Sequence, residues 1–282
     1  SSLKVSTSTA KATLTGTNEF GIQQRIEGRN LQVLNHGTSS ASKATLSFWV
    51  RSNKTGTYVV WFYKEGSNRN IQRQFTISSA DTWEKKALTI DGDTSGSIAN
   101  DNSNELEFFI VLGTGPDRSS GTAPTTWQTL DNADRYVGQT VNILDSTSNN
   151  FYLTGVQLEV GEQATPFEHR SFADELQRCQ RYYETIHSLI PGAVSGTTTG
   201  HLFAEYKVRK RAAATLERFG DATRNVAQAN NSNKEVTNTP SLAMTGVDGC
   251  RMSFTTAGSL TAGDATYLKD LQTTPIAFNA EL

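Results

Sequence analysis

Three aromatic residues in two neighbouring apolar stretches are the side chains best suited to bind a ligand. Trp49 lies in KATLSFWVRS, and Trp61 and Tyr63 lie in TYVVWFYK. Each of the three alternates with residues expected in the core, so each should point to the opposite face of its strand. Sugar rings present apolar C–H faces that stack on Trp and Tyr rings. We therefore predict a glycan-binding platform made of Trp49, Trp61 and Tyr63.

These rings also have a purely structural interpretation. Each could pack beneath a loop or against another subunit, and the predicted platform would then be an oligomer interface. Trp83 and Trp127, the other two tryptophans of the chain, are weaker candidates for stacking on a sugar.

A polar loop, DGDTSGSIANDNSN, contains the best candidates for metal ligands. Its residues Asp91, Asp93 and Asp101 supply the hard oxygen donors that calcium prefers. Their spacing fits no EF-hand, and an Asx-rich surface turn is the alternative. Calcium is the one cofactor that the sequence suggests.

Catalytic motifs are not evident in the sequence. Glu168, His169 and Arg170 could be imagined as acid, base and anion clamp, but neighbours in an extended segment point in different directions. Glycoside hydrolysis needs two carboxylates that face one bond across a cleft. We expect these three residues to fasten a bend in the chain, and we do not expect an enzyme.

The charge of the chain does not favour binding to nucleic acid. The net charge is -2 and the isoelectric point is about 6.1. One basic run carries Lys207, Arg209, Lys210 and Arg211. No aromatic residues interleave with these cations in the manner of nucleic-acid-binding proteins, and acidic residues lie nearby. A solvated edge or an intersubunit salt-bridge face is expected there.

Cysteine spacing and hydropathy exclude two further classes of protein. Cys179 and Cys250 belong to no CxxC or Cys/His cluster, so zinc binding has no support. Both are expected to be buried thiols, and a disulfide between them is the alternative. The chain has no apolar run long enough to cross a bilayer and begins with no signal peptide, so membrane insertion is not expected.

Strands are predicted by apolar residues that recur with period two. The residues expected in the core are listed here by stretch: Leu46, Phe48 and Val50; Tyr58, Val60 and Phe62; Leu106, Phe108, Ile110 and Leu112. The stretch 58–63 is apolar on both faces, which indicates a central hairpin. A closing strand in FYLTGVQLEVG is expected to place Tyr152, Thr154, Val156, Leu158 and Val160 on one face.

One amphipathic helix follows these strands. In SFADELQRCQRYYE the residues Phe172, Leu176, Cys179 and Tyr183 form one stripe at helical spacing, and Ser171 is a suitable N-cap. We predict a helix from Asp174 to Glu184, with this stripe buried in an oligomer or domain interface.

The order of these elements predicts the fold class. Because no long helix is expected before residue 174, parallel βαβ winding is excluded and an antiparallel β-sandwich or jelly roll remains. We predict a mainly β protein with a jelly roll at 1–165, a bend and linker helix at 166–190, and a second, smaller β domain at 191–282.

The run GVQLEVGEQATPFEHRSFADELQRCQRYYE closely resembles a segment of bacteriophage virion proteins, especially tail-fibre and related structural proteins. Upstream, QQRIEG, ATLSFWVRSNKTGTY and DTWEKKALTIDGDTSG resemble the carbohydrate-binding-module-like jelly roll that precedes this segment in such proteins. The resemblance is weaker after Tyr183. The final FNAEL resembles the ending of many of these chains, which implies that residue 282 is the C-terminus.

The resemblance implies a non-enzymatic virion component, located in the tail rather than the head, that contacts host surface glycans. It also implies other virion proteins as partners and a homotrimer, in which the helix lies near the threefold axis or against a neighbouring sandwich. A structural adaptor or head-associated fibre without glycan binding is the first alternative, and a glycan-degrading enzyme is the second. The helix could also bridge the two β domains of its own chain.

Overall fold

The chain consists of two compact units. A computed structural model describes residues 1–186, 190–218, 226–229, 232–238, 240–268 and 276–281. The first unit is Ser1–His169 and the second is Arg170–Glu281. Each unit has its own hydrophobic core, and each is described by itself below.

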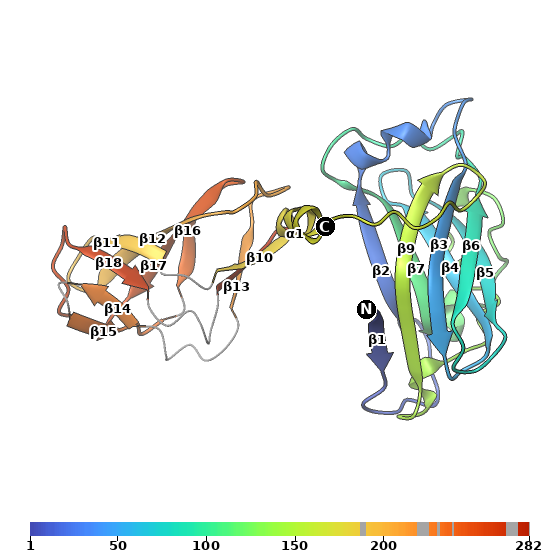
Figure 1. Cartoon of the computed structure of the whole chain (residues 1–282), viewed down its shortest axis with the longest axis horizontal. Coiled ribbons are helices and arrows are strands. Elements are labelled where there is room, and N and C mark those ends of the chain that lie inside the picture. The colour runs from blue at the N-terminus through green and yellow to red at the C-terminus, as the bar shows by residue number, and fades with distance from the viewer. Residues whose placement is uncertain (187–189, 219–225, 230–231, 239, 269–275, 282) are drawn as a thin grey trace. The chain divides into compact units, whose positions relative to one another are not determined.

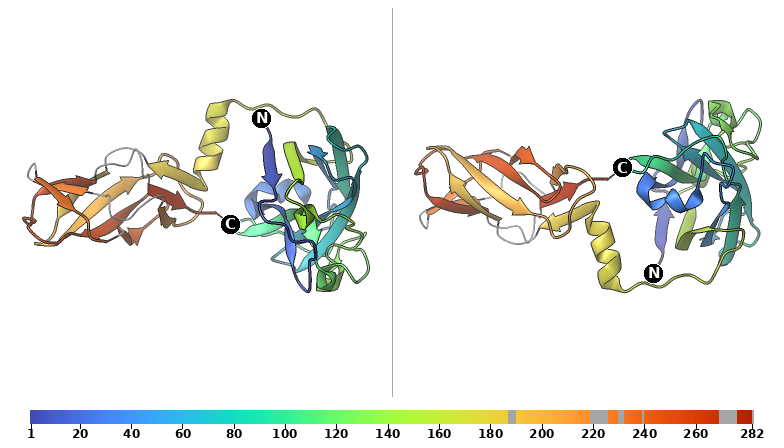
Figure 2. Two further views of the ribbon diagram at one scale, coloured as in Figure 1. Left: turned by 90° about the horizontal axis from the view of Figure 1, so that it is seen from below. Right: turned by 90° about the horizontal axis from the view of Figure 1, so that it is seen from above.

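The first unit is an antiparallel β-sandwich with the strand order of a jelly roll (Figure 1). Its strands are β1 (Leu3–Ser6), β2 (Glu19–Glu27), β3 (Ala44–Ser52), β4 (Gly56–Lys64), β5 (Arg69–Ile77), β6 (Glu84–Ile90), β7 (Asn104–Thr114), β8 (Gln128–Thr129) and β9 (Asn150–Val160). The four-stranded sheet has the order β1-β9-β3-β6, and the five-stranded sheet has the order β2-β7-β4-β5-β8. Successive strands alternate between the two sheets, except that β4 and β5 share one sheet, as do β7 and β8. These two strand orders are those of a jelly roll with the short strand β8 added at one edge. The two layers are visible in Figure 2.

Short 3-10 helices occupy the loops of this unit. They are η1 (Gly28–Asn30), η2 (Gln32–Leu34), η3 (Pro116–Arg118), η4 (Asn132–Asp134) and η5 (Ile143–Asp145).

The core between the two sheets confirms most of the predicted inward faces. All ten residues predicted for the inner faces of β3, β4 and β7 belong to one buried cluster. In β4, the outward residues Val59 and Trp61 are also buried, in a separate small cluster with Val111 and Tyr136. The inner face of this strand packs in the sandwich core and its outer face packs against Tyr136, which explains why both of its faces are apolar.

The closing strand β9 does not keep one face along its length, so the predicted face was wrong. Its inward residues are Phe151 and Leu153, and further along Leu158 packs against the core. Between Leu153 and Leu158 the pairing with β3 shifts register, because β9 has one residue more than β3 in this stretch. Gly155 adopts a φ of +60° there. Such a bulge reverses which side chains point inward, and period-two counting cannot detect it.

The second unit is also antiparallel and begins earlier than predicted. It contains the helix α1 (Phe172–Gln180) and the strands β10 (Tyr183–Ile186), β11 (Ile190–Val194), β12 (Thr199–Glu205), β13 (Thr215–Arg218), β14 (Val226–Ala229), β15 (Ser232–Glu235), β16 (Ser241–Thr245), β17 (Gly249–Thr255), β18 (Ala265–Leu268) and β19 (Ile276–Asn279). The sheets have the orders β10-β19-β13 and β15-β14-β18-β11-β12-β17-β16. Because β10 already pairs with β19, residues from 183 onward belong to the second unit and not to a separate linker.

The helix starts and ends two to four residues before its predicted bounds. Ser171 caps it as predicted, since its hydroxyl accepts a hydrogen bond from the backbone N–H of Asp174 at 3.1 Å. The helix ends at Gln180, because Tyr183 is the first residue of β10 and pairs with Asn279.

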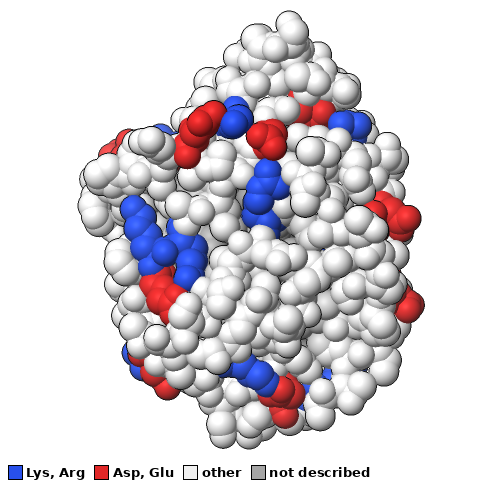
Figure 3. Space-filling view, turned by 90° about the vertical axis from the view of Figure 1, so that its right-hand side faces the viewer, with Lys and Arg blue, Asp and Glu red and all other residues white. Residues whose placement is uncertain are grey.

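Charged side chains form no single basic field on the face that Figure 3 shows. Most Lys and Arg side chains there lie beside Asp or Glu. Among the residues that the structure describes, no helix has the length and apolar character needed to span a membrane.

The bulge at Gly155 predicts a specific sensitivity to substitution. Gly155→Ala should lower the free energy of unfolding by about 1–2 kcal/mol, because a residue with a Cβ is disfavoured at positive φ. The new Cβ would also lie 3.3 Å from Trp49 Cδ1. Gly155→Asn, which adopts this conformation more readily, should cost less. All four tryptophans lie in the first unit, so urea unfolding followed by tryptophan fluorescence reports on this unit. Equal losses for Ala and Asn would contradict a backbone origin.

Candidate functional site

The outer face of the four-stranded sheet carries alternating rings and cations. Strand alternation places Trp49 and Arg51 on this face, because Phe48 and Val50 are fully buried in the core. Register then sets the rows: Lys4 is opposite Tyr152, Tyr152 is opposite Arg51, and Lys85 is opposite Trp49. We call this surface the aromatic–cation face; its residues are Lys4, Trp49, Arg51, Trp83, Lys85 and Tyr152.

Tyr152 holds two cations in place at the centre of this face. The Arg51 guanidinium carbon lies 5.3 Å from the centre of the Tyr152 ring, and Lys4 Nζ lies 5.7 Å from it. Both distances are in the range of cation–π attraction. Trp83 packs against the edge of Tyr152 with ring centres 6.3 Å apart and planes inclined by 62°. Tyr152 therefore orders its neighbours, whereas Trp49 and Trp83 remain 41% and 38% exposed.

The bulge in β9 creates space beside Trp49. A Cβ on Gly155 would lie 3.3 Å from Trp49 and 3.9 Å from Phe167, so the glycine lets both rings lie over the backbone. Phe167 is 42% exposed and meets His169 edge-on at 5.1 Å. An apolar surface thus continues from Trp49 towards the end of the first unit.

The structure does not bring the three predicted platform residues together, so the predicted platform was wrong. Trp49 lies on the four-stranded sheet, whereas Trp61 and Tyr63 lie on β4 of the five-stranded sheet. Trp61 is only 1% exposed. The Arg135 guanidinium carbon lies 4.1 Å from its ring centre, and Tyr63 stacks on it at 5.0 Å.

The loop that carries Arg135 is itself fastened to the sheet. The Tyr136 hydroxyl donates a hydrogen bond to the Glu19 carboxylate at 2.8 Å. Arg118 and Arg135 lie 3.7 and 3.6 Å from the same carboxylate. This network keeps the loop over Trp61 and removes the indole from contact with ligands. The sequence shows the aromatic face but not the loop that covers it.

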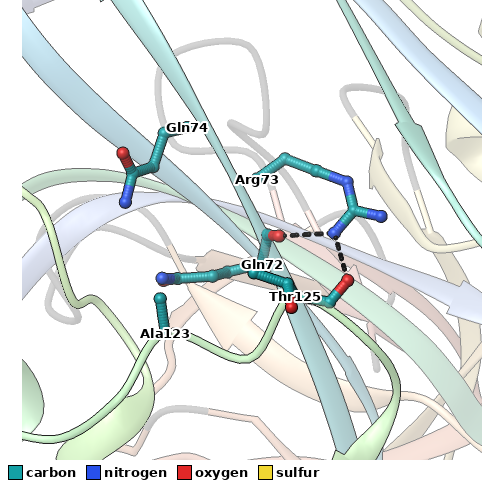
Figure 4. Close-up of a pocket in the computed structure, with 5 residues that line it drawn as sticks. All are labelled: Gln72, Arg73, Gln74, Ala123 and Thr125. Carbon is teal, nitrogen blue, oxygen red and sulfur yellow. Dashed lines mark hydrogen bonds between the residues drawn. The ribbon is translucent and has the colours of Figure 1, made fainter.

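A shallow cavity of about 480 Å³ lies beside β5 and is lined by Gln72, Arg73, Gln74, Ala123 and Thr125 (Figure 4). The side-chain donors of Gln72, Arg73 and Gln74 already have acceptors in the chain, whereas Gln72 Oε1 is buried without a partner among the described residues. Arg73 donates to the backbone oxygens of Thr89, Thr125 and Gln72, and both glutamine amides donate to Val137 O. The cavity therefore offers a ligand few available donors.

The predicted calcium ligands are engaged in separate interactions, so they do not form a metal site. Asp93 is 2% exposed and forms ion pairs with Lys64 at 2.6 Å and with Arg69 at 2.7 Å. Asp91 pairs with Lys43 and Arg73 at the surface. No group of three or more His, Cys, Asp or Glu residues suited to a metal occurs in the described part of the chain.

Asp101 makes a local turn instead. Its carboxylate accepts a hydrogen bond from the backbone N–H of Ser103 at 2.8 Å, which is the Asx turn that was the alternative to a metal site.

The predicted interface residues of the helix are exposed. Phe172 is 82% exposed, Leu176 is 42% exposed and Cys179 is also exposed, and α1 buries no residue. Tyr183 does not share their helix, because it starts β10. The prediction that Cys179 is buried was wrong, while Cys250 is partly buried, and both thiols are free. Burial raises the pKa of the Cys250 thiol.

The basic run at 207–211 is not one surface patch. Lys210 is 1% exposed and pairs with the equally buried Glu184 at 2.8 Å, and Arg211 donates to the backbone oxygen of Ala280 at 3.0 Å. Arg209 remains at the surface near Asp248. At the predicted bend, Arg170 lies 3.6 Å from Glu175 at the start of the helix.

The fold and the exposed face define a β protein of two antiparallel units with an aromatic–cation surface on the first. No protein-family model matches the chain, and no curated protein matches it. Among solved structures, wild-type discoidin II from Dictyostelium discoideum is similar at 10% identity and a TM-score of 0.21. The alignment covers 86% of this chain and 75% of the discoidin chain. A chain of the T=1 Penaeus vannamei nodavirus structure is similar at 8% identity and a TM-score of 0.19. The alignment covers 100% of this chain and 99% of that chain. Likenesses this low carry no argument, so the fold class rests on the strand order itself.

Asp93 should make the free energy of unfolding of the first unit depend on pH in the acid range. Burial alone would raise its pKa, but hydrogen bonds from Arg69, Lys64 and the Ser95 backbone outweigh burial and lower the pKa to about 2. Its stabilising effect is therefore complete above the ordinary value of 3.8 and is lost as the pH falls through about 2. Asp93→Asn should cost about 3 kcal/mol at neutral pH, because it leaves Lys64 buried without its carboxylate.

Asp91→Asn provides the matched control, since Asp91 is half exposed and should contribute less than about 1 kcal/mol. Urea unfolding followed by tryptophan fluorescence at several pH values measures both. Equal effects of the two substitutions would show that the buried ion pair does not stabilise this unit.

Proposed function

We propose that this chain is a non-enzymatic virion component that binds host surface glycans through the aromatic–cation face. The observation that carries the proposal is the pair of tryptophan rings, Trp49 and Trp83, which lie on a sheet face and remain 41% and 38% exposed. The resemblance of residues 155–184 to phage tail-fibre and related proteins supports a place on the virion, in the tail rather than the head.

The chemistry of the face suits a sugar. Exposed indoles offer flat apolar surfaces for the C–H faces of sugar rings, and polar groups between them can bind hydroxyls. Arg51 and Lys85 supply donors beside Trp49, because they occupy the neighbouring positions on the same face. This arrangement replaces the platform predicted around Trp61, whose ring is covered.

Two alternatives are distinguished by experiment. A structural adaptor without glycan binding is favoured by one observation, the exposed stripe of α1, which suits contact with other virion proteins. A glycan-degrading enzyme would need two carboxylates across a cleft. The carboxylates beside the aromatic–cation face are Asp81, which pairs with Arg51 at 3.5 Å, and Glu159, which accepts hydrogen bonds from Thr165. Release of sugar products from host polysaccharide would favour the enzyme.

Substitution of either exposed tryptophan should weaken glycan binding. We expect Trp49→Ala and Trp83→Ala each to raise the Kd for a host surface polysaccharide about ten-fold, equal to ~1.4 kcal/mol, because each removes a stacking surface. Binding of the full chain is measured on an array of host glycans and then by calorimetry.

Val33→Ala is the control, since Val33 is 64% exposed and lies outside this face. Unchanged urea midpoints would show that the variants remain folded. Full binding by folded Trp49→Ala and Trp83→Ala variants would contradict the proposed site.

We also propose that the chain forms a homotrimer through α1. An isolated helix of nine residues is marginal in water, and most helices gain stability by burying an apolar face. The stripe Phe172, Leu176 and Cys179 follows the four-three spacing of a coiled-coil seam, and its members are exposed in the single chain. A second and third copy of the same stripe would cover it.

Leu176→Glu should convert the trimer to monomers without unfolding the chain, because three charges would meet at the seam. Light scattering at micromolar concentration measures the mass. Gln177→Glu adds the same charge to the neighbouring position on another side of the helix and should leave the trimer intact. A wild-type chain that is monomeric at this concentration would refute the assembly.

A further inference from the structure

We propose that the aromatic–cation face selects anionic glycans, and that it binds a sugar carboxylate between Lys4 and Arg51 with Tyr152 beneath them. This inference rests on the proposed glycan binding and specifies the class of glycan. Its evidence is the row across the four-stranded sheet, in which Lys4, Tyr152, Arg51 and Trp83 follow one another from β1 to the start of β6.

The cations of this row are only partly neutralised by the protein. Among the described residues, no carboxylate lies within ion-pair distance of Lys4, whose contact on this face is the Tyr152 ring. Arg51 has one carboxylate partner, Asp81, at the long distance of 3.5 Å, and its Nε, which is buried, finds no hydrogen-bond acceptor in the described part of the chain. A planar guanidinium binds a carboxylate best in a two-pronged arrangement, which Asp81 does not complete.

Other charged groups facing this surface leave an excess of positive charge. Lys85 lies in the adjoining row beside Trp49 and interacts electrostatically with Glu159. The oxygens of Glu159, however, accept hydrogen bonds from Thr165. Among the residues that the structure describes, three cations, Lys4, Arg51 and Lys85, thus face two carboxylates, Asp81 and Glu159, both of which lie at the margins. An anionic ligand would complete the pairing.

The geometry favours a glycan over a nucleic acid as the anion. Bases also stack on aromatic rings beside cations, but single-stranded nucleic acid carries a charge at every nucleotide and binds grooves with many cations. Here the cations are few, carboxylates flank them, and the chain is negative overall. An acidic polysaccharide supplies carboxylates together with apolar sugar faces for Trp49 and Trp83.

Matched polymers that differ only in charge test the selectivity. The probes are polygalacturonate and alginate, each compared with its carboxyl-reduced form, which keeps the sugar backbone and loses the anion. We expect the full chain to bind at least one acidic polymer about ten-fold more tightly than its reduced form at low salt, and the difference should shrink at 0.5 M NaCl. Lys4→Gln and Arg51→Gln should each weaken binding of the acidic polymer more than binding of its reduced form, and so remove most of this difference.

Lys43→Gln is the matched control, because Lys43 is exposed and pairs with Glu162 at 2.9 Å away from this row. Equal binding of acidic and reduced polymers would overturn the anion selectivity while supporting glycan binding. Binding of neither acidic nor reduced polymers, although host glycans bind on the array, would also overturn it. Tighter binding of phosphorylated mannan or of oligo-dT than of every carboxylate polymer would overturn the choice of a sugar carboxylate.

Discussion

The alternation of side chains along β-strands, combined with burial of one apolar face, is the constraint on which the first unit depends. Burying Phe48 and Val50 between the sheets forces Trp49 and Arg51 to the outside. Antiparallel register then places Tyr152 and Lys85 beside them. The core stabilises the fold and, through this alternation, also determines which functional groups share a surface. A one-residue slip in β3 would exchange the positions of the aromatic–cation face with core positions, so register determines the composition of this face.

The sequence was sufficient to predict the fold class and the inner faces of three strands, because these depend on local periodicity. It was not sufficient wherever a distant segment intervenes. Trp61 follows the same alternation as Trp49, yet Arg135 lies over its ring, and the two residues are far apart in sequence. Asp93 has the composition of a calcium ligand, but Lys64 comes from an earlier strand to neutralise it. In both cases the partner is invisible to a local pattern.

The bulge in β9 is a third limit of a different kind. A glycine such as Gly155 can be recognised in the sequence as a residue that interrupts a strand. Which face Val156 and Leu158 then point to can be known only from the register with β3. Tyr183 illustrates the same difficulty at the helix end. It continues the helical spacing of Phe172 and Leu176, but pairing with β19 is available from that residue onward, and the strand competes successfully with another turn of helix.

The shape of the aromatic–cation face connects local recognition to assembly. Two open rings and a few cations on a flat sheet enclose little of a ligand, and pockets that bind small molecules tightly enclose most of it. A single face of this kind is therefore expected to bind weakly. Linking several copies makes each later contact intramolecular, which can raise the overall affinity by orders of magnitude without any new contact. On the proposed function, the exposed stripe of α1 supplies that link. The bare helix and the shallow face, which are each difficult to explain in a monomer, are then parts of one arrangement: weak glycan sites that act together because their chains are joined.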